Sequence, residues 1–258
     1  MKDKKEKYKV NLVWTIGIFA VWELVAFFLD KIAHDPMAEA KLPYPHIIIV
    51  SIAQNFTELM SAAGLTFSRA VVGFALGAAI GVVLAIIMSL SKIAEKIALP
   101  YLVISQMIPV LGLAPIIFTL ARNMNTSRII IAAYITFFPV AINMLSGLNS
   151  VESDKKDLLY SYAANKKSIY LKLMIPYSLP YLFAGLKIAA PMSITASILV
   201  DMLGSSGGIG VKLLYALYSG TRDIFWDSVI TSALMGIISY FIVVFLERIC
   251  MPWRKQIA

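Results

Sequence analysis

Long apolar runs alternate with short polar segments along this chain of 258 residues. A transmembrane helix needs about 20 mainly apolar residues to cross the hydrocarbon core of a bilayer. Six runs meet that length, near residues 12–32, 70–90, 97–121, 128–148, 180–202 and 228–249. Because only helices and closed barrels can span a bilayer, the pattern predicts an all-α membrane protein with six transmembrane helices in one domain, residues 1–258.

Two further segments are amphipathic and too polar to span. After Pro45, apolar residues recur at helical spacing up to residue 64, with polar residues on the opposite side. This predicts an external helix over residues 45–64 that lies along the membrane surface. The second segment covers residues 155–176 and interleaves lysines with apolar residues at the same spacing.

Composition and charge support a membrane protein and set its orientation. Hydrophobic residues make up 59% of the chain and charged residues 15%, against about 45–50% and about 25% in soluble proteins. The net charge of +8 does not indicate nucleic-acid binding, because Lys and Arg of membrane proteins collect in cytoplasmic loops. We therefore expect a multi-pass protein of the cell (inner, cytoplasmic) membrane. Both termini, the tail 1–11 and the segment 155–176 are expected in the cytoplasm.

Glycines and prolines inside the runs predict how the helices pack. Gly73, Gly77 and Gly81 form one ridge without side chains, which lets another helix approach closely. Pro109 and Pro115 interrupt the third run, and the fifth contains another proline, so we expect kinked spans. Kinked helices suit a bundle that opens and closes.

Polar residues inside the spans are candidates for a translocation pathway. Those of the fifth run recur every four residues and share one helix face. Such groups either line a cavity or form hydrogen bonds between helices. The last of them, Asp201, either is solvated or caps the following GSSGGIG loop. The candidates are Gln106, Thr136, Asn143, Ser193, Ser197 and Asp201.

Signals of catalysis are sparse. His34 and His46 lack the spacing of a metal site, and Cys250 is the only cysteine, so no intrachain disulfide can form. The turn at residues 204–210 is rich in glycine but lacks the lysine of a phosphate-binding loop. We assign no catalytic residue, metal or cofactor to this chain. A membrane enzyme or a passive channel is the alternative class, and only Glu23, Lys187 and Asp201 would serve it.

The basic segment 155–176 can either lie on anionic lipid or dock onto a soluble partner. Its register resembles the cytoplasmic loop motif of ABC importer permeases, E-A-A-x-x-x-G-A-x-x-x-x-x-F-x-x-I-x-L-P. Asp157 stands at the Glu position, and two leucines replace the two alanines. Ala163 replaces the glycine, and Tyr170 stands at the aromatic position. In the family this loop fits a cleft of the ATPase. The residues to which the resemblance extends this role are Asp157, Leu158, Leu159, Tyr162, Ala163, Ala164, Tyr170 and Pro176.

Other segments extend the resemblance over nearly the whole chain. LPYLFAGLKIA from Leu179, DMLGSSGGIG from Asp201 and QMIPVLGLAPIIF from Gln106 are similar to the nitrate/sulfonate/taurine branch of these permeases, which also includes riboflavin and thiamine-precursor importers. The resemblance implies a type I ABC importer fold and a second permease copy that forms a homodimer. It also implies two ATPase subunits that bind ATP and Mg, and an external substrate-binding protein or lipoprotein. The chain is expected to contact membrane lipid but not nucleic acid.

Of all these properties, the substrate is the one about which the sequence says least. The polar candidates in the spans include no basic residue, which argues against a small strong anion. We therefore expect a vitamin-like or heteroaromatic solute such as riboflavin or a thiamine precursor. A nitrate, sulfonate or taurine importer is the alternative.

Overall fold

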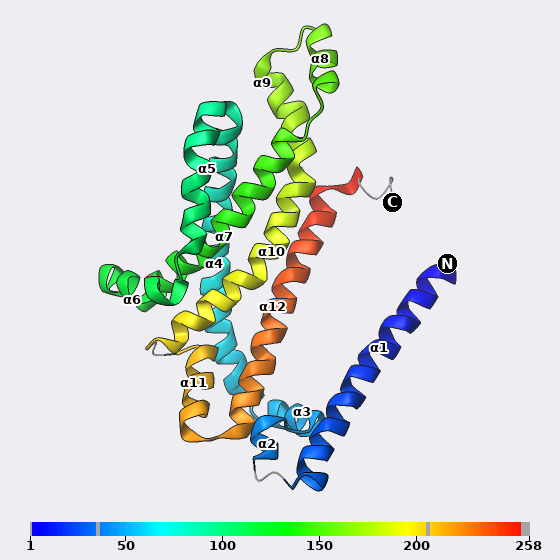
Figure 1. The fold of residues 1–258 in the computed structure, drawn as a ribbon, viewed down its shortest axis with the longest axis vertical. Helices are drawn as coiled ribbons and strands as arrows, with labels where there is room; N and C mark the ends of the chain where they lie inside the picture. The colour runs from blue at the N-terminus through cyan, green and yellow to red at the C-terminus, as the bar shows by residue number, and fades with distance from the viewer. Residues whose placement is uncertain (1, 35–36, 205–206, 254–258) are drawn as a thin grey trace. The chain divides into compact units, whose positions relative to one another are not determined.

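The computed structural model describes residues 2–34, 37–204 and 207–253. These residues form α-helices and two π-helical turns, and no strand occurs among them (Figure 1). The elements are α1 (Lys2–Phe27), η1 (Phe28–Ile32), α2 (Ala38–Lys41), α3 (Pro45–Gln54), α4 (Phe56–Leu90), α5 (Lys92–Met107), α6 (Val110–Ala121), α7 (Met124–Asn149), α8 (Ser153–Ser161), α9 (Lys166–Ile169), η2 (Tyr170–Met174), α10 (Ile175–Met202), α11 (Ile209–Ser219) and α12 (Arg222–Cys250).

The helices confirm the predicted membrane-spanning character. Five segments of the described chain are long and apolar enough to cross a bilayer, and there are six if α5 and α6 together count as one span. The five are Val13–Ile32, Phe56–Leu90, Met124–Asn149, Lys166–Met202 and Arg222–Cys250.

The third predicted run is not one kinked helix. α5 and α6 meet at an angle of 96°, and both residues between them have extended backbone conformations, Ile108 at ψ 120° and Pro109 at ψ 125°. Proline disfavours the helical conformation of the residue before it, so Ile108 ends α5. Pro109 then precedes α6, while Pro115 lies inside that helix. The prediction of a bend was right, but residues 97–121 form two separate helices instead of one kinked helix.

One other predicted boundary was also wrong. The external helix expected over residues 45–64 ends at Gln54, and residues 56–64 are instead the beginning of α4. Asn55 breaks the helix, and its side chain donates to Oδ2 of Asp227 at 3.2 Å. Asparagine is unfavourable inside helices because its side chain forms hydrogen bonds with nearby backbone groups in place of the helical ones. Residues 2–11 of the expected tail are helical as part of α1, and the first candidate span begins after them, at Val13.

The chain divides into two compact units, residues 1–61 with 212–230 and residues 62–211 with 231–258. In the first unit, indole groups join its segments. Trp22 donates to the carbonyl oxygen of Pro43 at 3.0 Å, and Trp226 donates to that of Ala40 at 3.2 Å. Oγ of Ser51 donates to Asp227 at 2.6 Å, which holds α3 against the start of α12.

The second unit contains the glycine ridge, which packs on α7 as predicted. A Cβ atom added at Gly73 would lie 2.5 Å from Cβ of Ala132, and one added at Gly81 would lie 2.9 Å from Cβ of Val140. These distances are far below van der Waals contact, so the close approach of α4 and α7 requires glycine. The row therefore serves helix packing.

The most extensive helix contact of this unit joins α7 and α10, which lie side by side in Figure 1. Small residues again permit it, because a Cβ at Gly185 would lie 2.7 Å from the carbonyl oxygen of Pro139. Leu148 and Val140 of α7 and Val200 of α10 are fully buried. α8 and α9 lie beyond the first turn of α10, at one end of this unit (Figure 1).

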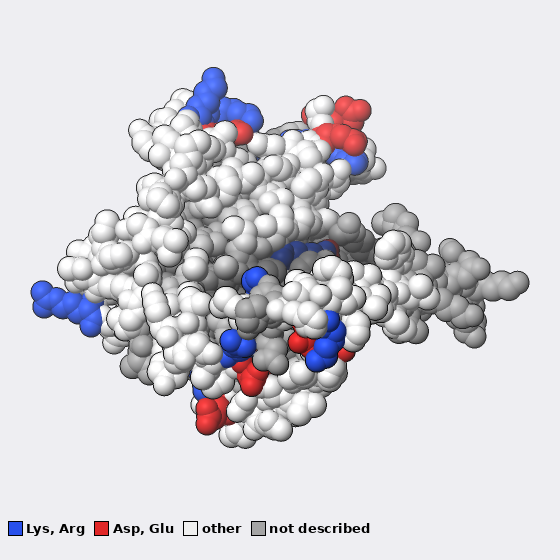
Figure 2. All heavy atoms as spheres, turned by 60° about the horizontal axis from the view of Figure 1, so that its bottom comes forward, with Lys and Arg blue, Asp and Glu red and all other residues white. Residues whose placement is uncertain are grey.

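The surface is mainly apolar, as a lipid-facing protein requires. Side chains of α1 such as Trp14 and Leu24 are exposed. Figure 2 shows a largely uncharged face on which basic and acidic side chains gather in small separate groups. Such a surface is stable in hydrocarbon and would associate in water.

Candidate functional site

The loop that precedes α10 has a defined backbone structure. α8 ends in a turn in which the amide of Ala163 donates to the carbonyl of Tyr160 at 2.9 Å and the amide of Ala164 donates to that of Leu159 at 3.1 Å. This pair of bonds is the Schellman motif, which satisfies the last carbonyl groups of a helix. The residue that follows the helical cap must adopt the left-handed conformation, and Ala163 has φ +57°.

A second helical segment begins directly after the turn. Oδ1 of Asn165 caps α9 by accepting from the amide of Ser168 at 2.8 Å. From there the helix continues through η2 into α10, where Pro176 lies in the first turn. The segment 155–176 is therefore two helical pieces joined by a turn. The helical spacing predicted for this segment is present in both pieces, but the interruption at Ala163 was not predicted, because no glycine marks it in the sequence.

Side-chain contacts attach this loop to α10 and α4. Nζ of Lys155 lies 3.3 Å from Oε2 of Glu152 and 5.0 Å from the centre of the Tyr177 ring. The hydroxyl groups of Tyr170 and Ser89 are 2.5 Å apart, which joins η2 to the end of α4. α8 is thus attached both to α10 and, through the following turn, to α4.

The outer face of α8 is exposed and partly apolar. Tyr162 is 76% exposed and Leu158 is 58% exposed, while Asp157 and Ala163 are also exposed. The other residues of the predicted set, Leu159, Ala164, Tyr170 and Pro176, are half-buried. An apolar pair at the tip of a supported helix is the arrangement that fits a groove on a partner.

The left-handed conformation at Ala163 leads to a prediction. A left-handed residue other than glycine costs about 1–2 kcal/mol, and glycine costs about 0.5–1 kcal/mol in chain entropy, so Ala163→Gly gains about 0.5 kcal/mol locally. Hydrogen exchange of the amides in α8 is expected to slow accordingly. Ala164→Gly is the control, because its φ is not positive and the variant is expected to exchange faster. Faster exchange in Ala163→Gly would contradict this account of the turn.

Three of the polar pathway candidates form local hydrogen bonds inside the second unit. The hydroxyl of Thr136 donates to the carbonyl of Ala132 at 2.8 Å, and Nδ2 of Asn143 donates to that of Pro139 at 2.7 Å. The hydroxyl of Ser193 donates to Ala190 at 2.8 Å. Each of these bonds is to a backbone carbonyl of the same helix, and no hydrogen bond joins the three side chains to one another within the described chain. Nε2 of Gln106 is buried and has no hydrogen-bond partner among the residues described.

The other two candidates meet in a buried charge cluster at the end of α10 farthest from α8. Oδ1 of Asp201 lies 2.6 Å from Nε of Arg128, and its Oδ2 accepts from the hydroxyl of Thr66 at 2.5 Å. The hydroxyl of Ser197 donates to the carbonyl of Thr66 at 3.3 Å. Asp201 and Arg128 are 1% and 2% exposed, so of the two alternatives given for Asp201 the solvated one was wrong.

The same cluster fixes part of the glycine-rich turn. The amide of Gly210 donates to Oδ2 of Asp201 at 3.4 Å, and Arg128 donates to the carbonyl of Gly207. Gly208 has φ +119°, and a Cβ there would collide with the side chains of Asp201 and Thr66. The expectation that Asp201 caps this loop is thus confirmed, whereas Ser205 and Ser206 lie outside the described residues.

The sequence analysis did not single out Arg128, the first residue of the predicted run 128–148. Its position four residues into α7 gave a usable signal, since an arginine inside a span needs a buried partner. In the predicted run 180–202 the only acidic residue is Asp201. It lies at the same end of the second unit as Arg128.

These observations define a multi-pass helical protein of the cell membrane with an exposed interhelical loop. Residues 73–250 match the model of the family described as "Binding-protein-dependent transport system inner membrane component". The chain belongs to this family and is the permease component of an ABC importer. This confirms the family resemblance, the helical membrane fold and the localisation expected from the sequence.

Curated relatives cover most of the chain. The formylaminopyrimidine transport permease protein ThiX of Halalkalibacterium halodurans is 30% identical over 243 residues, covering 93% of both chains. The riboflavin transport system permease protein RibX of Chloroflexus aurantiacus is 30% identical, covering 83% of both. The nitrate import permease protein NrtB of Synechococcus elongatus is 26% identical, covering 85% of this chain and 81% of its own.

A solved structure shares the fold. The crystal structure of an amino acid ABC transporter with histidines matches with a TM-score of 0.62 at 16% identity, covering 77% of this chain and 97% of that chain.

Proposed function

We propose that this permease moves a small solute inward by alternating access, driven by two separate ATPase subunits and supplied by an external binding protein. The observation that carries the proposal is α8, which exposes Leu158 and Tyr162 while Lys155 and Tyr170 anchor the loop to the spans. A partner can shift the equilibrium between two states only if it contacts them differently. A loop that is fixed at its base and exposed at its tip transmits such a difference to α4 and α10.

We place this loop and both termini in the cytoplasm. Lysines are concentrated in residues 2–9 and 155–172, and positive residues collect on that side. The ATPases bind ATP and Mg, so this chain needs no cofactor of its own. A second copy of the permease, or a related chain, completes the translocation pathway.

The substrate is a vitamin-like or heteroaromatic compound. ThiX and RibX, whose names refer to a formylaminopyrimidine and to riboflavin, are both 30% identical to this chain, and the nitrate permease NrtB is 26% identical. The buried Arg128 is paired with Asp201, so its charge is balanced and offers little attraction to a small anion. Nitrate or sulfonate import is the second candidate, favoured by the similarity to NrtB.

Reconstitution tests both parts of the proposal. The permease is expected to copurify with an ATPase that carries G-x-x-x-x-G-K-[ST]. In liposomes with that ATPase and the binding protein, we expect ATP-dependent uptake of labelled riboflavin or formylaminopyrimidine and none of nitrate or taurine. Uptake of nitrate or taurine alone would reject the substrate, and passage of solute without ATP would reject the importer mechanism.

A further inference from the structure

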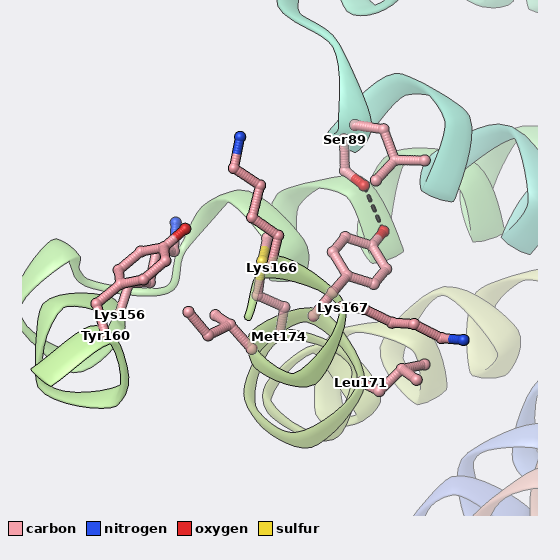
Figure 3. A pocket seen from close by; sticks show the side chains of 10 residues that line it. Ser89, Lys156, Tyr160, Lys166, Lys167, Leu171 and Met174 are labelled. Carbon is pink, nitrogen blue, oxygen red and sulfur yellow. Dashed lines mark hydrogen bonds between the residues drawn. The ribbon is translucent and has the colours of Figure 1, made fainter. Parts of the chain in front are cut away.

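A pocket of about 430 Å³ lies behind α8, on the other side from Leu158 and Tyr162. Figure 3 shows Lys156 and Tyr160 of α8 on one side of it and Ser89 of α4 on the other, with Lys166 between them. α9 and η2 form the remaining wall. The pocket therefore belongs to the second unit and lies where the apolar helix α4 ends.

The mouth of this pocket is basic. Lys156 and Lys166 line it, Lys167 lies at its rim, and none of the three forms a salt bridge within the described part of the chain. The hydroxyl of Tyr160 adds a hydrogen-bond donor. Nearby Lys155, by contrast, already has an acidic partner in Glu152. Two unpaired ammonium groups and a hydroxyl around one opening suit an anion with several oxygen acceptors, such as a phosphate diester.

Another part of the lining is apolar. Leu90, Ile169, Leu171 and Met174 line it, and Leu90 and Leu171 are more than half exposed. An inorganic anion has no apolar surface to bury against these residues. The glycerol and upper acyl carbons of a lipid do, and their removal from water is favourable. Basic pockets at the ends of membrane-spanning helices bind phospholipid headgroups for this combined reason.

Helical geometry separates this pocket from the exposed face of α8. Lys156 and Tyr160 are four residues apart and share one face, while Leu158 lies about 200° from Lys156 around the axis. A ligand in the pocket and a protein partner on the outer face can therefore be bound together. The pocket's occupant would also support α8 from behind.

We propose that this pocket binds the phosphate-bearing headgroup of an anionic membrane lipid. The double variant Lys156→Gln/Lys166→Gln tests this in the full-length permease in nanodiscs of phosphatidylcholine with dilute phosphatidylglycerol. Each lysine near an anionic headgroup contributes about fivefold in affinity, so the pair is expected to weaken phosphatidylglycerol retention, measured by native mass spectrometry, by roughly 25-fold. Lys96→Gln/Lys172→Gln is the matched control, because it removes the same charge from exposed positions outside the pocket.

Further measurements separate the sources of the anion. Inorganic phosphate is expected not to displace the lipid at millimolar concentration, and equal retention of phosphatidylcholine and phosphatidylglycerol by the wild type would overturn the proposal. So would unchanged retention by the double variant, or loss of ATPase copurification without loss of lipid, which would assign the lysines to the protein partner. Elution and thermal unfolding like those of the wild type show that the double variant is folded. The lipid result stands apart from the proposed transport function, since it needs neither ATPase nor substrate.

Discussion

Replacing Tyr162 with glutamate is expected to abolish substrate-stimulated ATP hydrolysis by the importer assembled with its ATPases and binding protein. Tyr162 is 76% exposed at the tip of α8, so the substitution disturbs little within this chain. In a partner's groove, however, an unpaired carboxylate loses its water, at a cost of about 3 kcal/mol or more. That corresponds to a loss of docking affinity of more than about 100-fold.

Two comparisons make this experiment decisive. Tyr162→Phe keeps the ring and is expected to retain most of the stimulation, because the exposed hydroxyl has no partner to lose within the described chain. Unfolding of the permease alone in detergent should be unchanged in both variants. Full stimulation in Tyr162→Glu would place the ATPase contact elsewhere and remove the main support for the coupling role of α8.

The second large effect is expected at the buried charge cluster. Arg128→Ala leaves the carboxylate of Asp201 buried without its cation, and breaking a buried pair in this way costs about 3–5 kcal/mol. The variant also loses the bond from Arg128 to the carbonyl of Gly207, so the turn before α11 is released. Thermal unfolding in detergent measures the loss, together with proteolysis at the turn.

A double variant distinguishes the charge effect from lost packing. Arg128→Met/Asp201→Asn removes both charges and keeps most of the volume, so it is expected to recover more than half of the lost stability. Lys187→Ala serves as the control, because its pair with Glu247 is more exposed, at 24% and 14% of the side-chain surface, and should cost less. An Arg128→Ala variant as stable as Lys187→Ala would show that the cluster adds little.

Hydropathy predicted the spans because each apolar run is long enough to cross a bilayer on its own. The positions and angles of the breaks in the helices were not predicted. Pro109 is compatible with either a kink or a full break, and only the structure shows the 96° angle. The end of α3 at Asn55 depends on Asp227, a residue of another helix. Sequence periodicity carries no information on that angle or on that contact.

In the candidate site, too, some features were predicted from the sequence and others were not. The motif register placed Ala163 at a glycine position, and its positive φ gives that correspondence a physical reason. The turn itself was not predicted, because an alanine within an amphipathic pattern normally continues a helix. The partner of Asp201 was not predicted either, because Arg128 stands at the edge of the predicted run 128–148 and the sequence does not show that it is buried.

One further consequence comes from the unbroken helical stretch Lys166–Met202, which is 37 residues long. At 1.5 Å per residue it is about 55 Å long, and its hydrogen bonds resist both stretching and shear. A tilt of about 5° at the end near Asn165 therefore displaces the end near Asp201 by about 5 Å. Inside this rod, bending is easiest at the π-helical turn η2 and at Pro176, Pro180 and Pro191, so these positions determine how much of the displacement reaches the far end.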